Sequence, residues 1–142
     1  MESESMRTDL DMVVQVARSL ASVNGTQAIF EEILKQSMRL TSADGGTLYV
    51  VRDTELHFEI VRNITLGLRF GGEGEPPVPE YFAPISFEDD SNRVVLHVVQ
   101  TGETANIANV YDSQFDFSIV QNPQYIVALV PSFLTQCPLV HV

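Results

Sequence analysis

The stretch DGGTLYVVRDTELHFEIVRN, residues 44–63, decides the fold of this 142-residue chain. Residues 44–46 are typical of a turn, and residues 47–52 are rich in Val and Tyr, which predicts a strand. Residues 53–55 form a short connection to a second predicted strand at residues 56–61. Because the connection is so short, we expect the two strands to form an antiparallel hairpin.

The second strand carries an alternating pattern of apolar residues. Leu56, Phe58 and Ile60 alternate with their neighbours along this strand. A period of two predicts that these three side chains share one face and that the strand is half buried.

Upstream of the hairpin the apolar period becomes that of a helix. Steps of four, three, four and three residues separate the members of an N-terminal apolar seam: Met6, Leu10, Val13, Ala17 and Leu20. This a/d spacing predicts a helix, and residues 1–22 are interpreted as a signalling or dimerisation helix. Two interpretations remain, because the seam can meet a second copy of the chain or the helix can lie on its own domain.

A second helix follows directly. Gly25 is suited to the left-handed residue that ends the first helix, and Thr26 is predicted to cap the second one. The apolar and small residues of this second helix share one face: Ile29, Phe30, Ile33, Ser37 and Leu40.

Downstream of the hairpin, residues 71–84 contain three Gly and four Pro, which predicts a long loop. Acidic residues and Ser91 at the start, with Gly102 just past the end, favour a helix at residues 92–100. The remaining predictions are strands or extended segments at 85–87, 104–107 and 133–140, and a helical turn at 109–113. Helices followed by a hairpin and mixed elements predict an α+β fold, an antiparallel sheet with helices packed on it.

The charge of the chain limits its partners. The formal net charge is −11, and residues 70–142 contain Arg93 as their one basic residue. Such an acidic surface disfavours nucleic acid as a partner. The N-terminus lacks the features of a secretion signal, and the uncharged tail after Asp116 is interrupted by prolines, so we expect no membrane span. These features predict a soluble, cytoplasmic protein.

Catalytic chemistry finds little support in the sequence. The one cysteine, Cys137, lies between apolar residues on a predicted strand, where a free cysteine is usually an inert core residue. His57, His97 and His141 are far apart and lack the spacing of metal ligands. We therefore expect no catalytic residues, no metal and no cofactor.

Several motifs follow the helix pair in a fixed order, namely 44–49 (DGGTLY), 62–67 (RNITLG), 106–111 (NIANVY), 115–118 (FDFS), and 132–135 (SFLT) with Pro138 and Leu139. In this order they resemble the motifs of GAF domains that precede HD-GYP phosphodiesterase or class III cyclase outputs in bacterial signalling proteins. The resemblance implies a GAF/PAS-like fold and a GAF-like domain over residues 23–142.

Two departures from the family pattern concern the C-terminal part. Residues 119–131 replace a charged, Gly-containing loop, and the family continues past the Pro-Leu strand with another strand and a helix. In the GAF topology that further strand lies beside the first strand of the sheet. We expect either that the chain is a fragment, its output domain lost by truncation, or that residues 119–131 substitute for the strand. The first interpretation is favoured.

The resemblance also suggests where a small molecule would bind. The candidate ligand-binding residues lie on a short helix and loop above the sheet: Ile107, Tyr111, Phe115, Phe117 and Ser118. Aromatic walls with one hydroxyl are typical of a small-molecule site, but they equally describe a packed minor core. We expect an unknown effector to bind beneath residues 70–84 and 106–118 of a homodimeric sensor. The alternative is a ligand-free dimerisation or scaffold domain.

Overall fold

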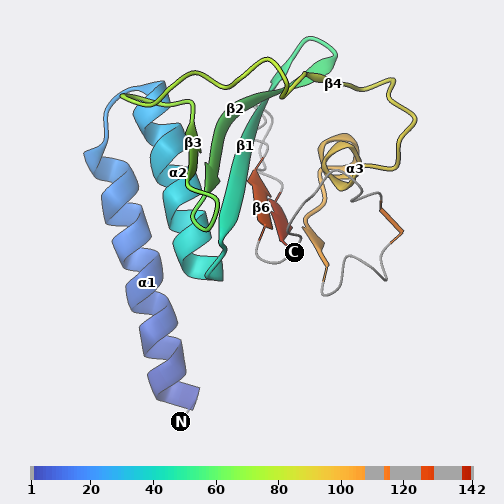
Figure 1. Ribbon diagram of the computed structural model, residues 1–142. Coiled ribbons are helices and arrows are strands. Elements are labelled where there is room, and N and C mark those ends of the chain that lie inside the picture. The colour runs from blue at the N-terminus through green and yellow to red at the C-terminus, as the bar shows by residue number, and fades with distance from the viewer. Residues whose placement is uncertain (1, 108–113, 116–125, 130–138, 142) are drawn as a thin grey trace.

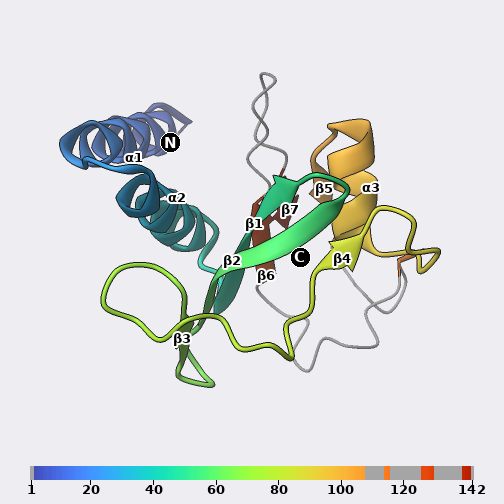
Figure 2. The same ribbon diagram turned by 90° about the horizontal axis from the view of Figure 1, so that it is seen from above.

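The computed structural model describes residues 2–107, 114–115, 126–129 and 139–141 of the chain. Over these residues the fold is α+β, with helices on both faces of one sheet (Figure 1). Seen from above, α1 and α2 form two successive layers on one side, and α3 covers the other side (Figure 2). The helices are α1 (Glu2–Ser22), α2 (Thr26–Thr41) and α3 (Val94–Thr101).

The strands of the described residues form one sheet in the order β3-β2-β1-β6-β7-β5, and β4 pairs with the other end of β2. Their bounds are β1 (Gly45–Arg52), β2 (Glu55–Asn63), β3 (Leu68–Phe70), β4 (Ile85–Ser86), β5 (Ala105–Asn106), β6 (Ile126–Leu129) and β7 (Leu139–His141). The predicted antiparallel hairpin is confirmed as β1 and β2. The sheet as a whole is mixed, because β6 pairs parallel with β1 and β5 pairs parallel with β7.

The place beside β1 is occupied. Ile126–Leu129 pairs with Gly45–Leu48, so part of the unusual segment 119–131 lies where the family resemblance expects a later strand. In the structure, this edge of β1 therefore has a partner strand. The interpretation that residues 119–131 supply the neighbouring strand fits the observed pairing.

Each face of the hairpin packs against its own helix. Leu34 and Met38 of α2 pack with Leu48 and Ile60 in one buried cluster. On the other face Leu56 packs with Val95 and Leu96 of α3 in a second cluster. The buried side of α2 is thus centred on Leu34 and Met38. The face expected from the sequence is only partly right, since Ile29 and Leu40 are 37% and 43% exposed.

A β-bulge in β2 corrects the alternation expected from the sequence. Leu48 pairs with Ile60 and the next residue, Tyr49, pairs with Phe58, so Glu59 is an extra residue in β2. Leu56 and Phe58 pack on the α3 side, whereas Ile60 packs on the α2 side. The three side chains therefore do not share one face.

Gly46 allows α2 to approach the sheet closely. A Cβ atom at this position would lie 2.8 Å from Leu34 Cδ1 and 2.9 Å from Met38 Cγ. Any side chain at Gly46 would therefore force α2 or its core residues to shift.

The helix ends differ in part from the sequence predictions. Gly25, with φ of 94°, is the N-cap of α2, and its carbonyl accepts a hydrogen bond from the amide of Ile29. Thr26 is the first residue of α2 rather than its cap. The helix expected at residues 92–100 is confirmed as α3, and Gly102, which was expected just past its end, is its left-handed C-cap residue.

The acidic residues before α3 act in a turn instead of the first helical turn. Asp89 accepts a hydrogen bond from the amide of Ser91 at 2.8 Å and lies 3.6 Å from the Arg93 guanidinium. Hydrogen bonding by the Ser91 side chain and by its amide lowers the pKa of Asp89, and the charge of Arg93 adds to this lowering. The helical turn expected at 109–113 and residues 133–138 of the last predicted strand lie outside the described residues. None of the described helices is long and apolar enough to cross a membrane.

Candidate functional site

Of the five ligand-binding residues predicted from the sequence, the structure describes Ile107 and Phe115. Ile107 is half-buried and follows β5, and Phe115 is half-buried next to α3. The Phe115 ring lies 5.3 Å from the His97 ring, measured between centroids. Tyr111, Phe117 and Ser118 lie outside the described residues.

The side of the sheet that faces α3 is filled by aromatic rings near β1 and β2. The Tyr49 and Phe58 rings are 4.6 Å apart, and Phe58 is 5.2 Å from Phe82 of the long loop. Burial raises the pKa of the Tyr49 hydroxyl above its usual range. This arrangement favours a packed core at this part of the α3 face.

A shallow pocket of about 470 Å³ lies beneath the loop at residues 71–78, part of the region where the sequence places an effector. Glu59, the extra residue of β2, lines it and accepts hydrogen bonds from Gln27 at 2.7 Å and Arg52 at 2.8 Å. Glu73 and Glu75 add further negative charge. The described lining does not include Ile107 or Phe115, so the two segments expected to enclose one effector are not brought together around this pocket.

A larger pocket, of about 920 Å³, lies on the α2 side of the sheet, between α2 and the β2–β3 turn. We call it the α2–β3 pocket. Its base is apolar and includes Leu34 and Met38, and Leu68 lies at the wall formed by β3. Its walls carry four cationic and two acidic side chains, namely Lys35, Arg39, Arg62, Arg69, Glu31 and Glu32. In a chain of net charge −11, this is a local excess of positive charge.

The β-bulge places Arg62 in this pocket. The extra residue, Glu59, moves Ile60 to the α2 side of the sheet, and Arg62, two residues later, faces the same way. The Arg62 side chain is only 12% exposed. Burial lowers the pKa of its guanidinium, and the neighbouring Arg69 adds to this lowering.

Arg62 makes its hydrogen bonds to backbone carbonyls, and its contact with a carboxylate is longer. Its guanidinium donates to the carbonyls of Val61 at 3.0 Å, Phe70 at 2.8 Å and Gly71 at 3.0 Å. The Glu31 carboxylate lies 4.0 Å away, at the limit of an ion pair. Arg62 therefore fixes the end of β3 and the start of the long loop against β2.

The acidic side chains of the pocket join neighbouring segments. Glu31 accepts a short hydrogen bond from the amide of Glu73 in the loop. Glu32 accepts a short hydrogen bond from Ser19 of α1 and one of 2.7 Å from Gln36. These hydrogen bonds lower the pKa of Glu32, which keeps it ionised. Both carboxylates are thus engaged within the fold.

The α2–β3 pocket offers cationic groups and apolar surface for non-covalent binding. No cluster of three or more His, Cys, Asp or Glu side chains in the described part of the chain could hold a metal ion. His57, for example, lies 3.2 Å from Glu55 in an isolated surface pair.

Sequence reasoning missed the α2–β3 pocket, although one signal was available. Five of the eight basic residues of the chain lie between positions 35 and 69. Four of these five line the pocket, and one of the four, Arg62, reaches it through the bulge at Glu59, which no pattern in the sequence marks.

Comparison with known proteins does not add a family. No family model, curated protein or solved structure matches the chain. Function is therefore inferred from the fold and from the residues described above.

Proposed function

We propose that this chain is a non-catalytic regulatory module of the GAF type, which acts as a homodimer joined through α1. In this proposal the sheet and its loops bind an effector, and the N-terminal helix transmits the change to a partner protomer. Regulation of this kind requires that an effector bind two states with different affinity.

The arrangement of elements supports the GAF-like part of the proposal. A helix pair precedes the β1–β2 hairpin, a long loop follows β3, and α3 packs on the sheet face opposite α2. The place beside β1, which the GAF topology gives to a late strand, is taken by β6. The motif order in the sequence points the same way.

The exposed apolar seam of α1 is the observation that carries the dimer. Met6, Leu10 and Val13 are 70%, 61% and 60% exposed. Ala17 is also exposed, and Leu20 is half-buried. The described part of the chain thus leaves most of this seam uncovered.

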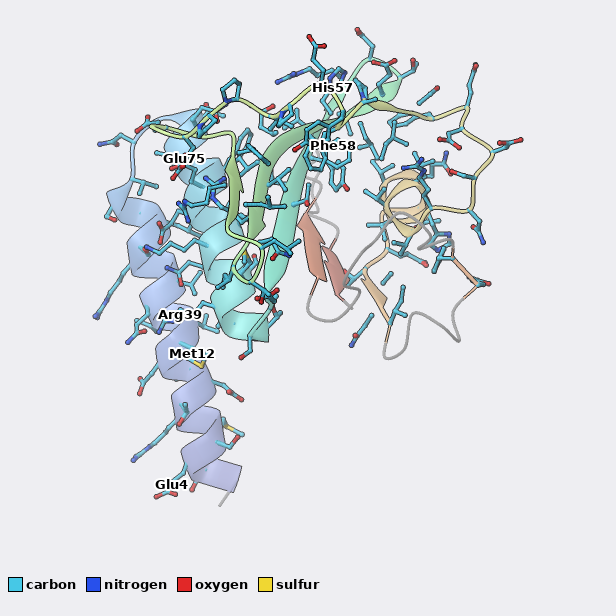
Figure 3. The ribbon with its side chains drawn as sticks, viewed as in Figure 1. Glu4, Met12, Arg39, His57, Phe58 and Glu75 are labelled. Atoms are coloured by element: carbon cyan, nitrogen blue, oxygen red, sulfur yellow. The ribbon has the colours of Figure 1, made fainter. Side chains whose placement is uncertain are left out.

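The contacts between α1 and α2 use another face of α1. Gln15 accepts a hydrogen bond from Arg39 at 2.8 Å, and Ser19 donates to Glu32. Both contacts come from the C-terminal half of α1. Figure 3 shows Met12 and Arg39 near the end of α2, with Glu4 on the part of α1 that extends beyond it. The part of α1 that extends beyond α2 is a short helical segment, and a short helix is marginally stable in water without tertiary packing. A second copy of the chain would supply that packing.

The energy expected from pairing the seam is moderate. Complete burial of an exposed Met, Leu or Val contributes roughly 1.5–3 kcal/mol, so three such residues from each protomer contribute roughly 6–12 kcal/mol at the observed exposure. Association costs roughly 4–15 kcal/mol. These terms are comparable, so we expect a dimer whose population depends on protein concentration.

The experiment measures the solution mass of the full chain by sedimentation over a wide range of concentration. The Leu10→Glu/Val13→Glu variant places two carboxylates in the seam, and we expect it to remain monomeric where the wild type dimerises. The Ser5→Glu/Thr8→Glu variant adds the same charge to α1 at exposed positions outside the seam and should dimerise like the wild type. A monomeric wild type, or an unchanged mass in the seam variant, would show that α1 is not the interface.

A ligand-free scaffold domain is a second candidate, favoured by one contact. Phe115, expected to line the effector site, instead has its ring against His97 of α3. Asn92 of the same region donates to the carbonyl of Gln114. If this region is a packed core, a thermal-shift panel of nucleotides, tetrapyrroles and small acids will leave the melting temperature unchanged while the dimer persists.

A further inference from the structure

We propose that the α2–β3 pocket binds a small organic anion, in which an oxyanion group is joined to an apolar body. The site lies on the α2 side of the sheet, away from Ile107, Phe115 and α3. It does not depend on self-association of α1.

The shape and base of the pocket suit an apolar body. Its volume of about 920 Å³ lies within the range of roughly 300–1,000 Å³ that is common for small-molecule sites. Leu34 and Met38, which are 1% and 9% exposed, form a fixed base between α2 and the sheet. A bound apolar group would cover further surface of Leu68 at the wall formed by β3.

The four cationic side chains of the pocket outnumber its two carboxylates, so their charge is only partly neutralised. Arg39 is held by two neutral amide oxygens, Gln15 at 2.8 Å and Gln36 at 3.3 Å. Within the described part of the chain, Lys35 forms no ion pair within 4 Å, although Glu32 acts on it through space. An oxyanion placed here would gain charge-assisted hydrogen bonds.

Arg69 supplies a further donor on the opposite wall. Its Nε donates to Glu75 at 2.7 Å, and this pairing uses one of the five donors of the guanidinium. The side chain is 61% exposed, so its remaining donors are open to a ligand. Lys35 and Arg69 thus approach the pocket from the helix wall and from the strand wall.

The negative groups of the pocket do not cancel this preference. Glu31 is engaged by the amide of Glu73, and Glu32 by Ser19 and Gln36. The six charged side chains of the lining leave a local net charge of +2, although the whole chain carries −11. Local excess charge of one sign attracts ligands of the opposite sign, even where the overall charge would repel them.

Three compounds, tested on the full-length chain, separate the parts of the proposed ligand. Phenyl phosphate and 3-phenylpropionate each join a ring to an oxyanion, and phenol carries a ring without the charge. Binding is measured by calorimetry, and its place by the amide NMR shifts of residues 28–43 and 62–69. We expect at least one of the two anions to bind with shifts centred on these residues, and phenol to bind much more weakly.

Matched charge variants locate the oxyanion. Lys35→Gln/Arg69→Gln removes one cation from each wall, and both positions are exposed, so the fold should persist, as circular dichroism would verify. We expect a loss of affinity of roughly tenfold for each cation removed, as for the loss of one charge-assisted hydrogen bond. Arg7→Gln/Arg18→Gln changes the net charge equally on α1, outside the pocket lining, and should leave the affinity within roughly twofold of the wild type.

Each outcome bears on the proposal. Binding of only one anion would identify the oxyanion as a phosphate or a carboxylate. The proposal is overturned if neither anion binds, if phenol binds as tightly as they do, or if both double variants lose affinity equally. Because Leu10 and Val13 lie outside the pocket lining, the Leu10→Glu/Val13→Glu variant tests the dimer without altering the pocket, so failure of the dimer and failure of the anion site are distinguishable.

Discussion

Replacing Arg62 tests whether one buried guanidinium holds the long loop on the sheet. In Arg62→Met the aliphatic part of the side chain is retained and the donors are lost. Three carbonyl oxygens, those of Val61, Phe70 and Gly71, then lose a partner that lies 2.8–3.0 Å away in the wild type. A buried hydrogen bond contributes about 1 kcal/mol net, so we expect a loss of about 3 kcal/mol in the free energy of unfolding.

Urea unfolding followed by circular dichroism measures this loss. With a slope of about 2 kcal/mol/M for a domain of this size, the midpoint should fall by about 1.5 M. Arg69→Met is the matched control, because Arg69 is 61% exposed and its ion pair with Glu75 is at the surface. Exposed pairs contribute about 0–1 kcal/mol, so the control should shift the midpoint by less than about 0.5 M.

Hydrogen exchange gives a local test of the same reasoning. Arg62 holds the carbonyls of Phe70 and Gly71, and the Gly71 amide donates to the carbonyl of Pro76 at 2.7 Å. In Arg62→Met the amide of Gly71 should exchange faster than amides of β1. The assigned role of Arg62 is refuted if its replacement costs no more than that of Arg69, or if exchange of Gly71 is unchanged.

Two further predictions concern α2. Leu34→Ala removes a side chain that is 1% exposed between α2 and the sheet, and the free energy of unfolding should fall by about 3 kcal/mol in the same urea assay. A loss similar to that of Ile29→Ala, at an exposed position of α2, would contradict the packing described. The hydrogen bonds of Ser19 and Gln36 lower the pKa of Glu32 below its ordinary value of 4.5, so their stabilisation is complete above about pH 4.5 and is lost as the pH falls through the lower pKa of the folded state. Glu32→Gln should therefore reduce stability by about 1 kcal/mol at neutral pH, and the difference from the wild type should shrink in strongly acidic urea titrations; a constant difference would exclude this role.

The parts of the fold that follow from local patterns were predictable. The a/d spacing from Met6 to Leu20 predicts α1, and the period of two with a short connection predicts the β1–β2 hairpin. Gly102 marks the end of α3, because glycine readily adopts the left-handed conformation found at this C-cap. These features depend on neighbouring residues, so the sequence alone is sufficient for them.

Long-range pairing was not predictable in the same way. Residues 126–129 read as a strand-sized apolar run, but their parallel pairing with β1 depends on contacts about 80 positions apart in the chain. Sequence reasoning left their role open and favoured a truncated domain. The bulge at Glu59 was missed because a regular alternation through Leu56, Phe58 and Ile60 looks the same in sequence with or without an extra residue.

For the candidate site, the sequence indicated which segments are involved but not which of them lie together in the fold. The long loop at residues 71–84 does cover a pocket, yet the described lining of that pocket excludes Ile107 and Phe115. The larger α2–β3 pocket joins Lys35 of α2 to Arg62 and Arg69 of the strands. Whether these side chains come together depends on which face of the sheet each strand residue occupies. The bulge places Arg62 on the α2 face, whereas regular alternation from Leu56 would place it on the α3 face.

The bulge also limits how this hairpin can be exchanged with that of another protein. Leu56 and Phe58 of β2 pack on the α3 side, whereas Ile60 packs against α2 and Arg62 lines the α2–β3 pocket. A regular donor strand of the same length would turn the side chains at positions 60 and 62 to the α3 side. A functional chimera would therefore have to carry the extra residue at Glu59, or take its second helix from the same donor as its hairpin.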